Sequence, residues 1–146
     1  VLDSHLRIPL NARVLNSRGS TIVATQREAD AKRIKRLRAR GVAVLQIPKW
    51  RKHPWRGLDL KYLMKKLAGK GITSVLVEGG GKVNASVLEM GLVDKLLFFI
   101  APKIVGGEKS ITPVEGEGID RIGEAIKLKD IKVRRFGEDI LFEGYV

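Results

Sequence analysis

The sequence contains no cysteine, which excludes disulfides, thiolate nucleophiles and cysteine metal ligands. It has only two histidines, His5 and His53, and we predict no metal site. Asparagine and glutamine together occur only five times beside abundant Lys, Arg and Glu, a balance typical of thermophilic proteins. The longest apolar run, residues 96–102, is far too short to span a bilayer, and no export signal follows Val1. We therefore expect a cytoplasmic protein without a membrane partner.

The positive charge of the chain is unevenly placed. The 146 residues carry a net charge of +12, and residues 1–56 hold 14 Lys and Arg against three acidic residues. A basic half of this kind attracts nucleic acid, an anionic membrane or a phosphorylated small molecule. The length is that of a single domain, and we predict one domain over residues 1–146. Because the first residues read as the end of a strand, we also expect a chain truncated at its N-terminus.

Strand and helix patterns alternate along the chain, which predicts an α/β fold. We expect strands at residues 21–25, 42–48, 74–77 and 95–105, and helices at residues 28–40, 59–67 and 82–90. Residues 126–134 and 140–146 follow as a hairpin. The predicted architecture is a mixed, mostly parallel sheet closed by a C-terminal antiparallel hairpin.

Residues 74–86, SVLVEGGGKVNAS, are the most informative segment. A strand that runs through glycines into a helix lets a ligand approach the backbone, and the free N–H groups of the helix N-terminus suit phosphate. Lys82, Asn84 and Ser86 add donors in the first turns. A tight turn without a ligand is the alternative. Asn84 also stands where the dinucleotide fingerprint has its third glycine, so this is no standard Rossmann motif.

Glu78 is predicted at the carboxyl end of a strand, the edge at which open α/β sheets bind ligands. Its carboxylate can accept hydrogen bonds from ribose hydroxyls or pyrimidine N–H groups, and a solvated or capping acid is the alternative. Ser4 and Arg7 follow another predicted strand end and offer a hydroxyl and a phosphate-binding guanidinium. Taken alone the signal is weak, because an aspartate and a serine after a strand, here Asp3 and Ser4, more often form a simple turn.

Residues 49–56, KWRKHPWR, interleave cations with indoles in a way that can bind nucleic acid. We favour a solvated loop, because no nucleic-acid-binding module surrounds the segment. The basic face of the helix at residues 28–40 is interpreted in the same way, as a solvated face.

Four sequence blocks together resemble the reductase domain of the riboflavin-biosynthesis deaminase/reductase family and its archaeal and fungal relatives. The blocks are DSHLRIP at residues 3–9, VEGGG at 77–81, GLVDK at 91–95 and IAPKIVGG at 100–107. The resemblance covers essentially the whole chain. It implies a dihydrofolate-reductase-like fold, a three-layer sandwich in which helices flank a twisted mixed sheet.

The resemblance also implies an activity, the NADPH-dependent reduction of a phosphoribosylamino-pyrimidine to its ribitylamino product. Carried over by motif, Ser4 contacts NADPH and Glu78 binds the substrate. The residues that hold the cofactor phosphates are then Gly80, Gly81, Lys82, Val83, Asn84, Ala85 and Ser86. The implied partners are the phosphorylated substrate, a second copy of the chain in a homodimer and, in bacterial members, a fused upstream deaminase domain; nucleic acid is not expected.

Part of the family pattern lies upstream of DSHLRIP, so we expect this chain to bind cofactor weakly and to turn over poorly. The competing hypothesis is a basic module that binds nucleic acid or another polyanion through residues 27–56. An ordinary NAD-linked oxidoreductase is disfavoured by the missing third glycine. The sequence leaves a uracil-type and a diaminopyrimidinone substrate equally open.

Overall fold

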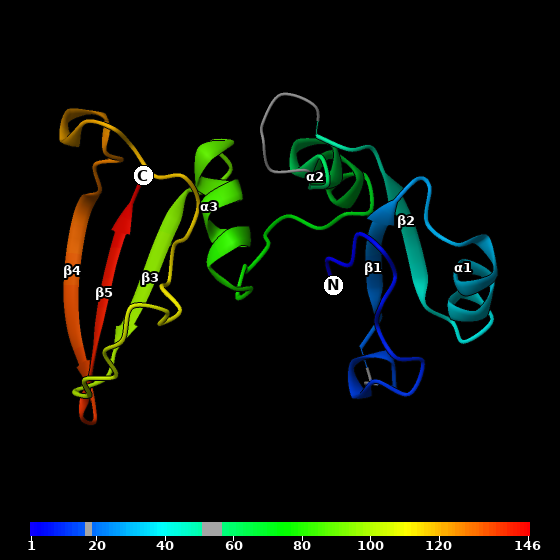
Figure 1. The fold of residues 1–146 in the computed structure, drawn as a ribbon, viewed down its shortest axis with the longest axis horizontal. Helices are drawn as coiled ribbons and strands as arrows, with labels where there is room; N and C mark the ends of the chain where they lie inside the picture. The colour runs from blue at the N-terminus through cyan, green and yellow to red at the C-terminus, as the bar shows by residue number, and fades with distance from the viewer. Residues whose placement is uncertain (17–18, 51–56) are drawn as a thin grey trace. The chain divides into compact units, whose positions relative to one another are not determined.

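A computed structural model describes residues 1–16, 19–50 and 57–146. The chain divides into two compact units, Val1–Ser74 and Val75–Val146. Figure 1 shows the helices and strands of both units.

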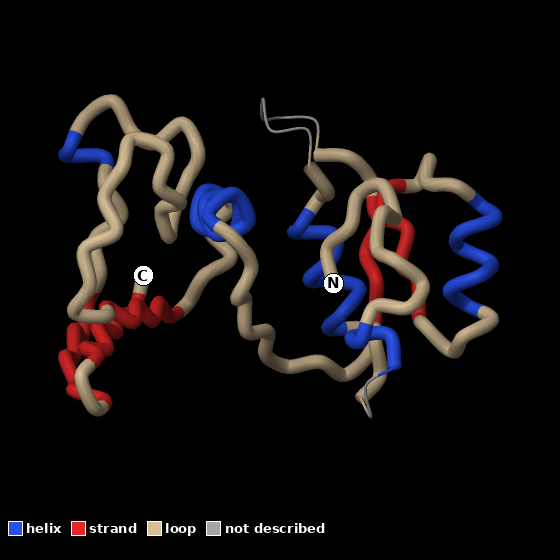
Figure 2. The backbone as a smooth tube through the Cα atoms, turned by 60° about the horizontal axis from the view of Figure 1, so that its bottom comes forward, coloured by secondary structure: helices blue, strands red, loops and turns tan. Residues whose placement is uncertain are grey.

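The first unit is built on a parallel pair of strands. Strand β1 (Ile22–Gln26) pairs with β2 (Ala43–Ile47), and the crossover between them contains α1 (Ala31–Arg38). A parallel bridge from Leu2 to Ala24 adds the start of the chain beside β1, as its strand-like sequence predicts. Helix α2 (Leu60–Ala68) completes the unit, and Figure 2 shows α1 and α2 on opposite sides of the two strands.

The core of this unit lies between the sheet and α1. Apolar side chains at helical spacing in α1 and at alternate positions of the strands meet there, because a helix and a sheet each bury one face. The buried cluster consists of Leu6, Leu15, Val23, Ile34, Leu37, Val42 and Val44. Leu15 belongs to a short 3-10 helix, Arg13–Asn16.

The helix boundaries of this unit follow from local sequence. Asp30 caps α1 by accepting hydrogen bonds from the backbone N–H groups of Lys32 and Arg33, and Asp59 caps α2 in the same way. Gly41, predicted to end the first helix, has φ +79°, a conformation that glycine adopts without strain. Helix α1 is shorter than predicted, because residues 28–30 form the turn and cap that precede it.

The second unit contains α3 (Gly81–Glu89) and a three-stranded antiparallel sheet. The strands β3 (Lys95–Ile100), β4 (Lys129–Phe136) and β5 (Asp139–Tyr145) lie in the order β3-β5-β4. β4 and β5 form the predicted hairpin, and Gly137 turns it with φ +60°. A 3-10 helix, Ile122–Glu124, precedes β4.

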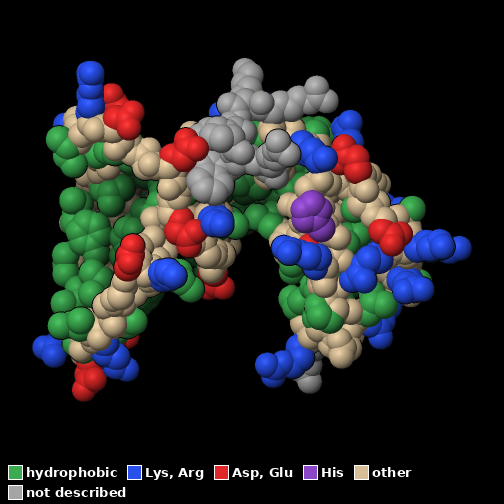
Figure 3. Space-filling model, viewed as in Figure 1, with side chains coloured by type: hydrophobic (Ala, Val, Ile, Leu, Met, Phe, Trp, Pro, Cys, Tyr) green, Lys and Arg blue, Asp and Glu red, His purple; other side chains and the backbone are tan. Residues whose placement is uncertain are grey.

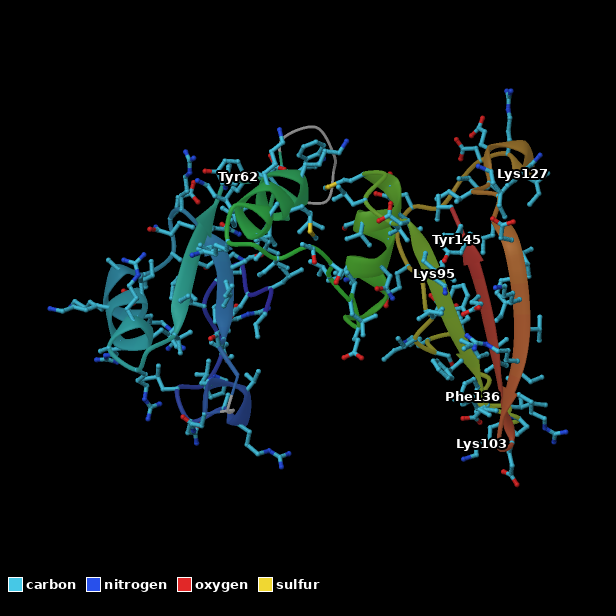
Figure 4. The ribbon with its side chains drawn as sticks, turned by 180° about the vertical axis from the view of Figure 1, so that it is seen from behind. Tyr62, Lys95, Lys103, Lys127, Phe136 and Tyr145 are labelled. Carbon is cyan, nitrogen blue, oxygen red and sulfur yellow. The ribbon has the colours of Figure 1, made fainter. Side chains whose placement is uncertain are left out.

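The antiparallel sheet carries an ion-pair cluster around one buried carboxylate. The carboxylate of Glu143, a side chain only 6% exposed, accepts a hydrogen bond from Arg134 Nη2 at 2.9 Å and lies 3.2 Å from Lys95 Nζ. Burial favours the protonated form of Glu143, but the hydrogen bonds and charges of the two cations outweigh it and lower the pKa. The Lys95 ammonium also lies 5.3 Å from the ring centroid of Tyr145 on the neighbouring strand, and both are labelled in Figure 4.

The structure corrects the prediction for residues 74–77. These residues form no strand, and the side chains of Val75 and Leu76 are 46% and 72% exposed. A strand requires a hydrogen-bonded neighbour, and within the described ranges no segment pairs with residues 74–77. Glu78 therefore does not follow the end of a strand. Without this strand, β1 and β2 form the one parallel pair among the named strands of the described residues, and the three other strands are antiparallel. The prediction of a mostly parallel sheet is therefore wrong for the described strands.

The predicted strand at residues 95–105 ends at Ile100, just before the segment that contains Pro102 and the two glycines Gly106 and Gly107. Proline removes a ladder donor, and both glycines have positive φ, so the chain leaves the sheet there. The predicted α/β class and the C-terminal hairpin are confirmed.

Candidate functional site

The glycine segment leads directly into α3. Gly80 is the N-cap residue, and no side chain caps this helix end. The partial positive charge of a helix N-terminus and its N–H groups favour an anion. The predicted helix start at residue 82 is confirmed to within one residue. Glu78, which precedes the glycines, is exposed.

The adjacent glycines Gly80 and Gly81 have different surroundings. A Cβ atom built on Gly81 would lie 2.6 Å from Glu115 Cγ and 2.7 Å from the backbone oxygen of Thr112. A Cβ atom on Gly80 would meet nothing within 4 Å. Gly81 is thus required for packing of the chain on itself, whereas Gly80 faces open space that a ligand can use.

The segment at residues 112–116 holds the start of α3. The backbone N–H of Glu115 donates to the Gly81 carbonyl at 3.1 Å, and the Asn84 amide donates to the Pro113 carbonyl at 2.8 Å. Gly116 packs against the buried Ala85, since a Cβ atom there would lie 3.1 Å from Ala85 Cβ. These contacts fix the helix N-terminus within its own unit.

Some of the predicted phosphate donors already have partners within the chain. Ser86 Oγ donates to the Lys82 carbonyl at 2.9 Å, and Asn84 is bound to Pro113 as described. Ala85 is buried, Val83 is half-buried, and the Lys82 side chain is exposed. Backbone groups at Gly80 and Gly81 are consequently better placed for a ligand than the side chains of Asn84 and Ser86. Neither motif nor spacing could reveal the Asn84 contact, because Pro113 lies 29 residues away in sequence.

Ser4 is positioned in the first unit, beside the end of β1. The Ala24 N–H donates to the Val1 carbonyl and the Asp3 N–H donates to the Ala24 carbonyl, both at 2.9 Å. The Ser4 carbonyl then accepts from the Gln26 N–H at 3.2 Å and from the hydroxyl of the fully buried Thr25 at 3.1 Å. Its side chain is left at the carboxyl end of two parallel segments, the edge at which such sheets bind ligands.

Other residues of the DSHLRIP motif have structural roles. The Asp3 carboxylate accepts a hydrogen bond from the Ile8 N–H at 2.7 Å and so closes the turn. Leu6 is fully buried despite a positive φ of 51°. Arg7 is exposed. The alternative interpretation of this motif as a turn therefore holds for Asp3.

The basic face of α1 is partly committed to contacts within the first unit. Arg33 Nη2 donates to the Ile8 carbonyl at 2.8 Å, Arg38 Nη2 donates to the Val44 carbonyl at 3.4 Å, and Arg40 donates to the Leu10 carbonyl. Figure 3 shows Lys and Arg side chains over this unit and apolar side chains over the β3-β5-β4 sheet. Three arginines that suggested a polyanion surface hold backbone carbonyls instead.

The Trp-containing loop lies largely outside the described residues, since 51–56 are not among them. Its ends are joined, because the Trp50 N–H donates to the Gly57 carbonyl at 3.0 Å and Lys49 forms an antiparallel bridge with Leu58. The solvated loop that we favour stays a prediction, and nucleic-acid binding stays its alternative.

Comparison with known proteins identifies the family. The model of the RibD C-terminal domain matches residues 1–142. The chain belongs to the RibD C-terminal domain family.

Curated relatives of this RibD-type chain cover all or nearly all of its length. It is 40% identical over 148 residues to the riboflavin biosynthesis protein RibD of Actinobacillus pleuropneumoniae, covering all of this chain and 38% of that protein. It is 38% identical over 143 residues to the 2,5-diamino-6-ribosylamino-4(3H)-pyrimidinone 5′-phosphate reductase of Methanothermobacter thermautotrophicus, covering 98% of this chain and 63% of that protein. The chain thus spans between about two fifths and two thirds of the length of these relatives.

Solved structures agree with the RibD-type fold. RibD of Acinetobacter baumannii superposes with a TM-score of 0.76 at 23% identity, over 99% of this chain and 36% of that one. The riboflavin biosynthesis reductase of Saccharomyces cerevisiae gives a TM-score of 0.73 at 21% identity, over 99% and 62%. An α/β fold of the RibD reductase type is therefore shown.

Two further features of the described ranges bear on this RibD-type site. No cluster of three or more His, Asp or Glu side chains suited to a metal ion occurs in residues 1–16, 19–50 and 57–146. None of the helices in that part of the chain has the length and apolar character needed to cross a bilayer.

Proposed function

We propose that this chain is the NADPH-dependent reductase domain of riboflavin biosynthesis, which reduces a phosphoribosylamino-pyrimidine to its ribitylamino product. The observation that carries the proposal is the 38% identity, over nearly the whole chain, to an archaeal protein named as a reductase of such a pyrimidinone phosphate. The relative from Thermotoga maritima is named as a combined deaminase and uracil-type reductase, and this chain corresponds to the reductase part in the proposal.

The glycine segment supports NADPH as the cofactor. Gly80 has open space around it and begins a helix whose N-terminus no side chain caps, so the residues present fit a pyrophosphate or phosphate group. When bound, NADPH supplies the hydride that reduces the sugar C1′. Gly80 and Gly81 would hold its phosphates through backbone N–H groups, while Ser4 would contact it through its hydroxyl.

Glu78 is proposed to bind the substrate. Its exposed carboxylate accepts hydrogen bonds, and the substrate offers ribose hydroxyls and pyrimidine N–H groups as donors. This role orients the substrate and requires no proton transfer by Glu78. Both substrate types named by the relatives offer such donors, so either can serve.

Four further inferences about fold, assembly, location and source belong to the same proposal. We infer a dihydrofolate-reductase-like three-layer arrangement over residues 1–146, a homodimer, a cytoplasmic location and a thermophilic source. Light scattering of the purified chain tests the dimer, and a monomeric mass at micromolar concentration would contradict it. A thermal unfolding midpoint in the ordinary mesophilic range would contradict the thermophilic source.

A titration of the purified chain with NADPH tests the proposed function. We expect saturable binding, and we expect Glu78→Gln to leave that affinity unchanged while it weakens binding of the pyrimidine substrate. Glu138→Gln, an exposed acid in the hairpin, is the matched control and should change neither. An absence of any NADPH binding would refute the proposal for this chain.

A further inference from the structure

The carboxyl edge of the first unit gathers positive charge that the proposed roles leave unused. Arg27 follows β1 directly and Lys49 follows β2. Because parallel strands end at the same edge of a sheet, these two cations and Ser4 share one edge. All three belong to the same compact unit.

The backbone around Arg27 is held in place beside Ser4. The residue before it, Gln26, donates its N–H to the Ser4 carbonyl at 3.2 Å. The Arg27 carbonyl accepts a hydrogen bond from Gln46 Nε2 of the neighbouring strand at 2.9 Å. Arg27 is thus tied on both sides, while its own side chain is exposed.

Two of the acidic groups near this edge are engaged elsewhere, and a third pairs with Lys49. The Asp3 carboxylate binds the Ile8 N–H, and the Asp30 carboxylate caps α1. Glu28 lies 3.7 Å from Lys49 Nζ, in an exposed pair whose side chains are 64% and 49% accessible. In the described part of the chain, the Arg27 guanidinium itself has no hydrogen-bond or ion-pair partner. Its charge is therefore available to a ligand.

A hydroxyl, a guanidinium and an ammonium at one edge of a sheet suit a phosphate monoester. Arginine presents paired donors to phosphate oxygens, and a serine hydroxyl adds a third hydrogen bond. Two phosphate monoesters are relevant to the proposed function, the 2′-phosphate of NADPH and the 5′-phosphate of the pyrimidine substrate. Because Ser4 is proposed to contact the cofactor, the 2′-phosphate of NADPH is favoured over the 5′-phosphate of the substrate.

We propose that Arg27, supported by Ser4 and Lys49, binds the 2′-phosphate of NADPH and sets the preference of this domain for NADPH over NADH. The inference rests on the proposed function, because it assumes a nicotinamide cofactor. Arg27 is a specificity-determining residue in this proposal and takes no part in hydride transfer.

The experiment separates this phosphate from the rest of the cofactor. Calorimetric titrations with adenosine 2′,5′-bisphosphate and with 5′-AMP compare ligands that differ in the 2′-phosphate. We expect the chain to prefer the bisphosphate, and Arg27→Gln to weaken its binding about tenfold, the loss typical of one exposed charged hydrogen bond. Binding of 5′-AMP should stay unchanged.

Arg36→Gln is the matched control. Arg36 is an exposed arginine of α1, and its replacement changes the net charge by the same amount. If general electrostatic attraction explained the preference, both variants would lose affinity equally. We expect the control to bind the bisphosphate like the wild type, and ribose 5-phosphate to bind Arg27→Gln as well as it binds the wild type.

Titrations with NADPH and NADH distinguish failure of this inference from failure of the proposed function. Equal affinity of the wild type for both dinucleotides, or an unchanged preference in Arg27→Gln, overturns the inference and leaves the reductase proposal intact. If Arg27→Gln loses affinity only for ribose 5-phosphate, the inference is also overturned, because Arg27 would then bind the substrate phosphate. A wild type that binds neither dinucleotide refutes both.

Discussion

Replacing Gly81 with alanine should destabilise the second unit, although glycine is the poorer helix former. The added Cβ atom would lie 2.7 Å from the Thr112 carbonyl oxygen, a backbone atom that cannot rotate away. Overpacking of this kind costs about 1–3 kcal/mol, and the gain in helix propensity returns at most about 1 kcal/mol. We expect a net loss of about 1–2 kcal/mol, which lowers the melting temperature by about 4–8 °C per kcal/mol.

Gly80→Ala is the control for this prediction. Its Cβ atom would enter open space, and the poorer N-cap preference of alanine is offset by the reduced entropy of the unfolded chain. The net change should stay within about 0.5 kcal/mol. Urea unfolding followed by circular dichroism measures both variants, and titration with NADPH then measures the ligand affinity. We expect Gly80→Ala to lose NADPH affinity at unchanged stability.

Two results would refute this reasoning. A Gly81→Ala variant as stable as the wild type would show that residues 112–115 do not pack against the helix start. A Gly80→Ala variant that binds NADPH normally would remove the cofactor phosphates from Gly80.

Three further predictions concern charged residues. Glu143→Gln should lower the urea midpoint, whereas Glu138→Gln, a change at an exposed residue, should not. The pKa of Glu143 is lowered in the fold, so its contribution to stability is present above the ordinary pKa of 4.5 and is lost as pH falls through the folded pKa. The urea midpoints of the wild type and Glu143→Gln should therefore converge in acid. Asp30→Ala removes the cap of α1 and should cost about 1 kcal/mol in the same assay, and an unchanged midpoint would contradict the capping role. Glu28→Gln removes a negative charge beside the proposed phosphate site and should strengthen binding of adenosine 2′,5′-bisphosphate roughly twofold at low salt. Unchanged binding would indicate that the phosphate does not lie near Lys49.

Local signals in the sequence predicted most helices and strands. Asp59 before an i, i+3, i+4, i+7 apolar pattern fixes α2, and Gly91 with φ +62° ends α3 where its sequence position indicates. Residues 74–77 have an equally good strand sequence but no strand, because pairing depends on a distant neighbour that the local pattern does not contain.

The candidate site was predictable as a segment but not atom by atom. The run of glycines indicates close approach of backbone, yet only the contacts with residues 112–115 show that Gly81 serves packing while Gly80 stays open. Asn84 was predicted as a ligand donor from its position in the first helical turns, but its side-chain amide donates to the Pro113 carbonyl. Arg27 belongs to no recognised motif, and only the hydrogen bond between the Gln26 N–H and the Ser4 carbonyl shows that Arg27 and Ser4 lie at the same edge of the sheet.

The position of β5 has a consequence for synthesis of the chain on the ribosome. Within the sheet, β3 and β4 each form backbone hydrogen bonds only with β5, which comes last of the three in sequence and lies between them. Both outer strands therefore emerge with their backbone groups unpaired. Nothing in the sheet can form until residues 139–145 have been translated, and during that interval the nascent segment is a target for chaperones and for mispairing with other chains.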